Sequence, residues 1–166
     1  MKKVILALLM VLPLSVSAQK FGHFNSSDIM QAMPETTAAR TELETKAKTY
    51  EEELKRMQDE LKAKSDDYEA NKATLIEDVK KRREQELNDL GQRFQEYYQK
   101  SQQDLEQLQN QKLTEIQQKV IKAVEEIGQA GGYVYIMDVT AGMPTFVNTS
   151  ISTDLTSQIK AKLGIK

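Results

Sequence analysis

The run of residues that decides the fold extends from Glu35 to Ala130 and reads ETTAARTELETKAKTYEEELKRMQDELKAKSDDYEANKATLIEDVKKRREQELNDLGQRFQEYYQKSQQDLEQLQNQKLTEIQQKVIKAVEEIGQA. It contains no proline and only two glycines, and it is rich in Glu, Lys, Gln, Leu and Ala. These residue types favour helix, whereas the turns of a globular domain would interrupt so long a run with Gly and Pro. The run therefore predicts long helices.

Apolar side chains recur along this run at alternating spacings of four and three residues, the pattern of a coiled-coil seam. The pattern loses phase between Asn71 and Val79 and then resumes. The first part comprises Leu43, Ala47, Tyr50, Leu54, Met57, Leu61, Lys64 and Tyr68. The second comprises Leu87, Leu90, Phe94, Tyr97, Ser101, Leu105, Leu108, Leu113, Ile116, Val120, Ala123 and Ile127.

One continuous helix over this run would be roughly 140 Å long and would need a partner along its whole length. A hairpin pairs the two parts of the seam within one chain. The phase break therefore predicts two antiparallel helices joined by a turn between Asn71 and Lys80, with arms of about 55 Å or more.

Segments with strand-like composition flank the run. Residues 20–24 read as a strand, and residues 25–28 supply side chains that cap a helix N-terminus. Residues 133–139 are apolar on both alternating faces, which predicts a strand that is covered on both sides. Residues 145–147 are predicted as a second short strand. A last helix, capped by Thr153 or Asp154, carries its apolar face on Leu155, Ile159 and Leu163.

Residues 1–18 have the composition of a secretory signal peptide. Lys2 and Lys3 precede an apolar stretch of about 13 residues, too short for a membrane-spanning helix, which needs roughly 20. Val16, Ser17 and Ala18 provide short side chains for cleavage before Gln19. We therefore expect an exported, soluble protein.

Charge and composition exclude several functional classes. Removing Lys2 and Lys3 with the signal peptide changes the formal charge from −2 to −4. A mildly acidic chain with interspersed charges is unsuited to binding nucleic acid through its phosphates, so no nucleic-acid partner is expected. The chain has no cysteine, which excludes disulfides and zinc sites built on thiolates.

The predicted fold class is α+β in three parts. Residues 1–18 are the signal peptide, residues 35–127 are a helical-hairpin tentacle, and residues 19–34 and 128–166 together are a β-rich body with a C-terminal helix. A body of about 55 residues without disulfides or metal buries too little surface to be stable alone, and its strands leave open edges. We expect it to oligomerise through the strand residues Phe21, Phe24, Tyr133, Val134, Tyr135, Ile136 and Phe146.

The sequence offers few groups for catalysis. His23 is the only histidine, and we interpret it as a structural or surface residue. The many carboxylate pairs of the hairpin are typical of a solvated helix face, and no glycine-rich phosphate loop follows a strand. We expect no enzymatic activity, no catalytic residue, no cofactor and no metal.

Two groups of hairpin residues are candidates for contacts with partners. Lys80, Lys81, Arg82 and Arg83 form the densest basic cluster, just past the predicted turn. They form either an ordinary solvated face or a patch that contacts an acidic client segment or an anionic membrane surface. Tyr97 and Tyr98 are adjacent, so they cannot both enter one narrow seam, and at least one is available to a partner.

The elements follow one another in a recognisable order, in which an opening strand and Asn25-Ser26-Ser27-Asp28-Ile29-Met30 precede Met33-Pro34-Glu35. The hairpin contains ELKRMQDEL at residues 53–61, and the chain closes with YVYIMD at 133–138 and DLT at 154–156. This order resembles the Skp/OmpH family of periplasmic chaperones over essentially the whole exported chain.

The resemblance implies a homotrimer in which three subunits pool their strands into a small β-barrel and three hairpins hang from it. It also implies an ATP-independent holdase, located in the periplasm after cleavage behind Ala18. Such a holdase binds unfolded outer-membrane proteins and prevents their aggregation during transit. The chain departs from the strongly basic members of the family, so no lipopolysaccharide-binding residues are assigned. The alternative is an exported coiled-coil adaptor of the envelope that binds a specific folded partner.

Overall fold

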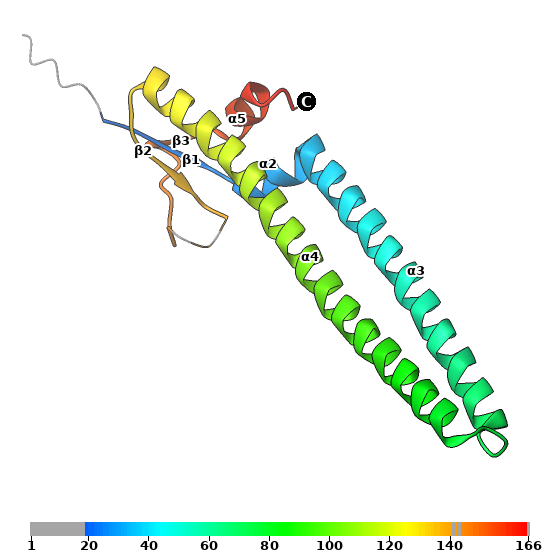
Figure 1. Cartoon of the computed structure of the whole chain (residues 1–166). Helices are drawn as coiled ribbons and strands as arrows, with labels where there is room; N and C mark the ends of the chain where they lie inside the picture. The colour runs from blue at the N-terminus through cyan, green and yellow to red at the C-terminus, as the bar shows by residue number, and fades with distance from the viewer. Residues whose placement is uncertain (1–18, 141, 143, 166) are drawn as a thin grey trace, which may run out of the picture.

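The computed structural model describes residues 19–140, 142 and 144–165 of the chain. The elements are β1 (Lys20–Phe24), α2 (Ser26–Ala32), α3 (Pro34–Asn71), α4 (Glu77–Gly131), β2 (Tyr133–Asp138), β3 (Ser152–Asp154) and α5 (Thr156–Lys162). α3 and α4 lie side by side and project from a small body that contains the strands, α2 and α5 (Figure 1). The predicted α+β class with a long helical hairpin is confirmed. The signal-peptide prediction concerns residues 1–18, which lie outside the described residues.

The hairpin turns at residues 72–76, inside the predicted window. α3 ends at Asn71, and the Lys72 N–H still donates to the Tyr68 carbonyl at 2.8 Å. Ile76 has extended backbone angles of φ −70° and ψ 154°, and α4 starts at the next residue. The 38 residues of α3 and the 55 of α4 correspond to about 57 and 82 Å of helix. α4 is the longer arm because its last turns continue into the body.

The break between α2 and α3 follows directly from the sequence. The Asn25 side chain caps α2 by accepting a hydrogen bond from the Asp28 N–H at 3.0 Å. Met33 is extended at ψ 130°, because the following proline disfavours helical angles there. Pro34 then occupies the first turn of α3, where its missing N–H costs no hydrogen bond.

The predicted seam between the arms is confirmed with two corrections. Ala47 is exposed, and Leu113 is 45% exposed rather than packed between the arms. The seam position between Leu108 and Ile116 belongs to Lys112, which lies four residues before Ile116 and whose ammonium pairs with the Glu42 carboxylate at 2.8 Å. A period close to 3.6 residues places this lysine, not the leucine, on the inner side.

The three strands form a parallel sheet in the order β2-β1-β3. The prediction of a strand at residues 145–147 was wrong, and the third strand is Ser152–Asp154. β2 and β3 lie on opposite sides of β1 and run in the same direction, so the chain must return across the sheet between them. Residues 139–151 make this crossing, and the segment read as a strand belongs to the connection.

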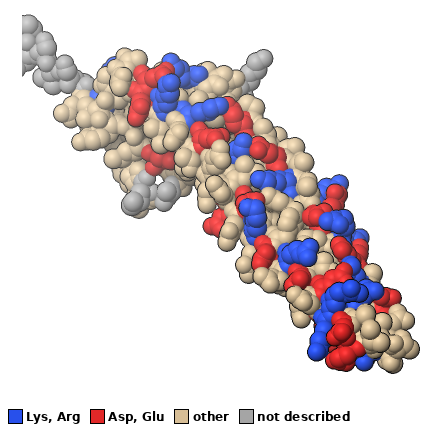
Figure 2. Space-filling model, viewed as in Figure 1, with Lys and Arg blue, Asp and Glu red and all other residues tan. Residues whose placement is uncertain are grey.

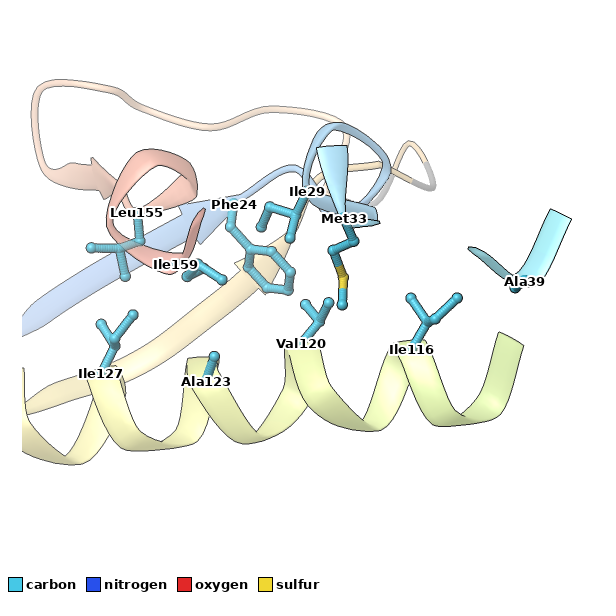
Figure 3. Close-up of a cluster of buried hydrophobic side chains, with 10 residues drawn as sticks. All are labelled: Phe24, Ile29, Met33, Ala39, Ile116, Val120, Ala123, Ile127, Leu155 and Ile159. Atoms are coloured by element: carbon cyan, nitrogen blue, oxygen red, sulfur yellow. The ribbon is translucent and has the colours of Figure 1, made fainter. Parts of the chain in front are cut away.

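The core lies between one face of the sheet and the helices (Figure 3). Side chains from the end of α4 point toward those of β1, α2 and α5, and the cluster consists of Phe24, Ile29, Met33, Ala39, Ile116, Val120, Ala123, Ile127, Leu155 and Ile159. Gly22 allows the close approach of α5, because a Cβ there would lie 2.6 Å from Leu155 Cδ1. Gly132, with φ +66°, ends α4 and lets the chain turn into β2.

Candidate functional site

The opposite face of the sheet is apolar and largely open. We call it the outer face, and it comprises Phe21, His23, Tyr135, Met137, Phe146 and Ile151. The rings of Phe21 and Tyr135 stack with centroids 6.4 Å apart. Tyr135, Phe146 and Ile151 are 62, 79 and 67% exposed, which is unusual for large apolar side chains gathered in one place. Together with the crossing segment they line a concave cavity of about 330 Å³.

The seven residues predicted for the oligomer interface are divided between the two faces. Phe24 is 8% exposed and belongs to the hydrophobic core. Tyr133 and Ile136 are partly buried and pack against the same core. The outer face receives Phe21, Tyr135 and Phe146. Val134, 46% exposed, lies where the pairing of β1 with β2 shifts register.

Sequence reasoning missed two residues of the outer face. Met137 is 48% exposed, and it lies two residues after Tyr135, so strand alternation would have identified it. Ile151 comes from the crossing segment, where no periodic pattern marks it. Residues 133–139 were expected to be covered on both sides, whereas in the structure β2 is covered on one side only.

His23 lies on the outer face in the central strand. Its Nδ1 is 2.9 Å from the Ser152 hydroxyl of β3. Asp154 is its register partner, and the Asp154 carboxylate accepts a hydrogen bond from the Thr156 N–H at 2.9 Å. Hydrogen bonds from Thr156, with a smaller contribution from nearby His23, lower the pKa of Asp154.

A second aspartate joins β2 to the start of α2. The Asp138 carboxylate accepts hydrogen bonds from the N–H groups of Ser26 at 3.2 Å and Thr140 at 3.0 Å. Burial acts to raise the pKa of Asp138, but the hydrogen bonds from Ser26 and Thr140 outweigh it and the pKa is lowered. In its ionised form Asp138 thus joins β2 to α2, whereas Asp154 accepts a local hydrogen bond at the start of α5.

Acid is expected to destabilise the body through these two carboxylates. Because the pKa of each is lower in the folded chain, their contribution to stability is complete above the ordinary value of 3.8 and is lost as the pH falls below it. Urea midpoints measured between pH 6 and 2 should fall steeply at the acid end. Asp138→Asn should flatten this fall, whereas Asp59→Asn on the exposed side of α3 should not. An unchanged profile for Asp138→Asn would contradict the assignment.

The two adjacent tyrosines of α4 take different positions. Tyr97 lies in the seam, where its ring meets Tyr50 edge-to-face at 5.9 Å and 77°. The Tyr50 hydroxyl donates to Asp104 Oδ2 at 2.9 Å, and burial together with this bond raises the pKa of Tyr50. Tyr98 points outward and is 47% exposed. Of the two residues predicted to face clients, Tyr98 is the one with an open ring.

The basic cluster of residues 80–83 lies within the first two turns of α4. Lys81 and Arg82 are exposed, while Arg83 Nη1 is 3.9 Å from Asp67 on the other arm. Nearby, the Tyr68 hydroxyl donates to Glu84 at 2.5 Å, which raises the pKa of Tyr68 to about 12. On the face of the arms that Figure 2 shows, basic and acidic side chains mingle, so no broad positive surface surrounds the cluster there.

Within the described residues there is neither a helix that could span a membrane nor a cluster of metal-ligating side chains. No helix within residues 19–140, 142 and 144–165 has the length and apolar character needed to cross a membrane. In the same part of the chain, no three His, Cys, Asp or Glu side chains are grouped so that they could hold a metal ion.

Comparison with known proteins places this geometry in a family. The model of a family described as outer membrane protein (OmpH-like) matches residues 20–163. The crystal structure of a candidate outer membrane chaperone (OmpH-like) from Caulobacter crescentus CB15 is similar, with a TM-score of 0.74 and 20% identity. The similarity covers 87% of this chain and 83% of that chain, and at this identity it shows a shared fold. None of the curated sequences compared matches significantly. Since the family model spans nearly all of the described residues, this chain belongs to the OmpH-like family.

Proposed function

We propose that this protein is an ATP-independent holdase chaperone of the periplasm that binds unfolded outer-membrane proteins and prevents their aggregation. Membership of the OmpH-like family and the likeness to a candidate outer membrane chaperone support a chaperone role. The observation that carries the proposal is the pair of long arms projecting from a body with an unfilled apolar face. We further propose that the body is the assembly unit and the arms are the client-binding unit.

The resemblance to the family implies a homotrimer, and the sheet has open edges through which copies could join. β2 and β3 are open edges of a parallel sheet, and rotation about an axis roughly along the strands would keep every strand parallel. β2 of one copy would then lie beside β3 of the next, and closure would remove the edges. In a closed sheet the outer faces turn inward, where small barrels are filled by side chains. Phe21, Tyr135 and Met137 would supply this filling.

In this division the body includes the end of α4 as well as residues 19–34 and 128–166. Ile116, Val120, Ala123 and Ile127 face the core, so α4 carries packing from the body directly into the arm. The free arms then extend from the level of Ile116 to the turn at residues 72–76. Residues 1–18 are proposed to be removed as a signal peptide during export.

The surface of the arms suits a holdase. Charged and amide side chains dominate it, while isolated apolar groups such as Tyr98 and Leu113 remain 47 and 45% exposed. Many weak contacts of this kind bind varied unfolded chains better than one tight pocket does. Binding the unfolded client lowers its free concentration and so slows aggregation.

An aggregation assay tests the holdase. A denatured outer-membrane β-barrel protein is diluted into buffer with or without a small excess of chaperone trimer, and light scattering is followed. We expect scattering to be suppressed without ATP. An unchanged rise in scattering at a severalfold excess would refute the function. Crosslinking to a single folded envelope protein would instead support the adaptor alternative.

The tip is proposed to contact anionic surfaces through its basic cluster. Each Lys or Arg near an anionic bilayer contributes about 1 kcal/mol, so Lys81→Glu with Arg82→Glu should weaken binding to phosphatidylglycerol vesicles about 30-fold or more at low salt. Vesicle co-sedimentation at two salt concentrations measures this. The matched control makes the same charge change at exposed mid-arm positions, with Lys48→Glu and Lys55→Glu. Equal binding by both variants and the unmodified protein would show that the cluster is an ordinary solvated face.

A further inference from the structure

His23, the only histidine of the chain, lies in the middle of the proposed interface. It belongs to the central strand β1, on the same face as the stacked Phe21 and Tyr135, and its ring is held by the Ser152 hydroxyl at 2.9 Å. Around it the outer face is apolar, and the crossing segment of residues 139–151 contains no charged side chain. Imidazole is the side chain whose ordinary titration falls between pH 5 and 8.

We propose that His23 makes the trimer acid-sensitive, so that lowering the pH from 7.5 to 5.5 shifts the protein toward separate subunits. This inference rests on the proposed trimer, which encloses the outer face. In a free subunit His23 is only partly buried and can bind a proton while water still reaches it. In the trimer the same proton would place a charge in a closed apolar space, which is unfavourable unless it is compensated.

Threefold symmetry adds a second cost. The copies of His23 occupy equivalent positions on three inward-facing sheets, so protonation introduces three like charges into one small interior. The assembled state therefore binds fewer protons than three free subunits do. By linkage, the association constant must then fall as the pH falls.

The groups around His23 do not reverse this direction. From β3, the Asp154 carboxylate attracts an imidazolium, but it is exposed at the end of the strand and accepts a hydrogen bond from the Thr156 N–H, so water and that bond limit the attraction. From β2, Tyr135 adds a neutral phenol, and the Asp138 carboxylate is engaged by the Ser26 and Thr140 N–H groups. The helices lie against the other face of the sheet.

Few groups other than His23 are expected to change protonation between pH 7.5 and 5.5. The lowered pKa values of Asp138 and Asp154 keep both carboxylates ionised at pH 5.5. The chain has one histidine and no cysteine, which leaves the amino terminus as the other group that ordinarily titrates in this range. A variant that replaces only His23 therefore separates the contribution of the histidine from that of the amino terminus.

Sedimentation equilibrium tests the proposal on protein purified from the periplasm after export of the full chain. At constant ionic strength, the association constant for the trimer should fall at least tenfold between pH 7.5 and 5.5. His23→Gln keeps a group that can bond Ser152 and does not titrate, so its association should be nearly independent of pH. His23→Leu provides a second test, since an apolar residue there should leave a trimer that persists at pH 5.5.

The possible results separate the acid sensitivity assigned to His23 from the existence of the trimer. A monomer at pH 7.5 overturns the trimer and the acid switch together. A trimer that keeps its association constant at pH 5.5 overturns the switch alone. The same acid dissociation in the unmodified protein and in either variant also overturns it, because the responsible proton would then bind elsewhere.

Discussion

Replacing Tyr135 with aspartate is expected to convert the proposed trimer into monomers. Tyr135 is 62% exposed in the subunit, where its ring stacks on Phe21, so the change costs an isolated subunit little. In the closed assembly, each of three aspartates would be buried against a face whose described lining residues include no Lys or Arg. Burying an unpaired charge costs several kcal/mol, so three of them should reduce the association constant by more than a thousandfold. Sedimentation equilibrium should give the subunit mass.

Tyr98→Asp is the matched control for this experiment. It makes the same chemical change at a tyrosine that is also exposed, at 47%, but lies on an arm away from the sheet. The control should remain trimeric, and it tests the predicted client contact in the aggregation assay at the same time. A Tyr135→Asp protein with three times the subunit mass would mean that the outer face is not the interface.

Replacing Ile159 with alanine is expected to lower the free energy of unfolding by about 2–5 kcal/mol. Ile159 is fully buried between the sheet and the end of α4, where it packs beside Leu155 (Figure 3). Truncation removes apolar contacts and leaves a cavity in a body that is small to begin with, so little of the remaining core can compensate. Urea unfolding at one fixed protein concentration measures the change.

Ile76→Ala makes the same substitution at the hairpin turn. Ile76 is 71% exposed, so its truncation should change the stability by no more than about 0.5 kcal/mol. The difference between the two variants then reports burial rather than the intrinsic effect of replacing isoleucine. Equal losses would show that the small core does not limit the stability of the subunit.

The hairpin could be predicted from the sequence because its signals are local. The absence of Gly and Pro, the seam spacing and the phase break are all visible within a few turns of helix. They placed the turn within ten residues, and the structure puts it at residues 72–76. The error at Leu113 arose because Lys112 can extend its stem across the seam and pair with Glu42, which a list of apolar residues does not anticipate.

The sheet was less predictable because its pairing is not local. β1 and β3 are separated by the whole hairpin, and the three residues of β3 have no strand pattern of their own. Their position depends on the crossing of the sheet by residues 139–151, which the sequence does not reveal. Phe146 was therefore assigned to a strand, although it does belong to the apolar outer face.

The sequence predicted an apolar interface in the body but did not predict all of its residues. Aromatic residues on both sides of the hairpin indicated a shared body, and Phe21, Tyr135 and Phe146 lie on its outer face. Alternation within β2 assigns Tyr135 outward, but the register shift beside Val134 displaces the pattern at the start of the strand. Phe24 looked equivalent to Phe21, yet the core of the subunit already encloses it.

The central position of β1 also determines the order in which the body can form. β1 is synthesised before the hairpin, whereas its neighbour β2 begins at Tyr133, after the complete hairpin. Pairing β1 with β2 before the hairpin forms would require closing a loop of about 110 residues, at a cost in chain entropy. Once α3 and α4 have paired, the two ends of the loop are already close together, and most of that cost is removed. We therefore expect the two arms to pair first, and their pairing to bring β1 and β2 together before the arms bind any other protein.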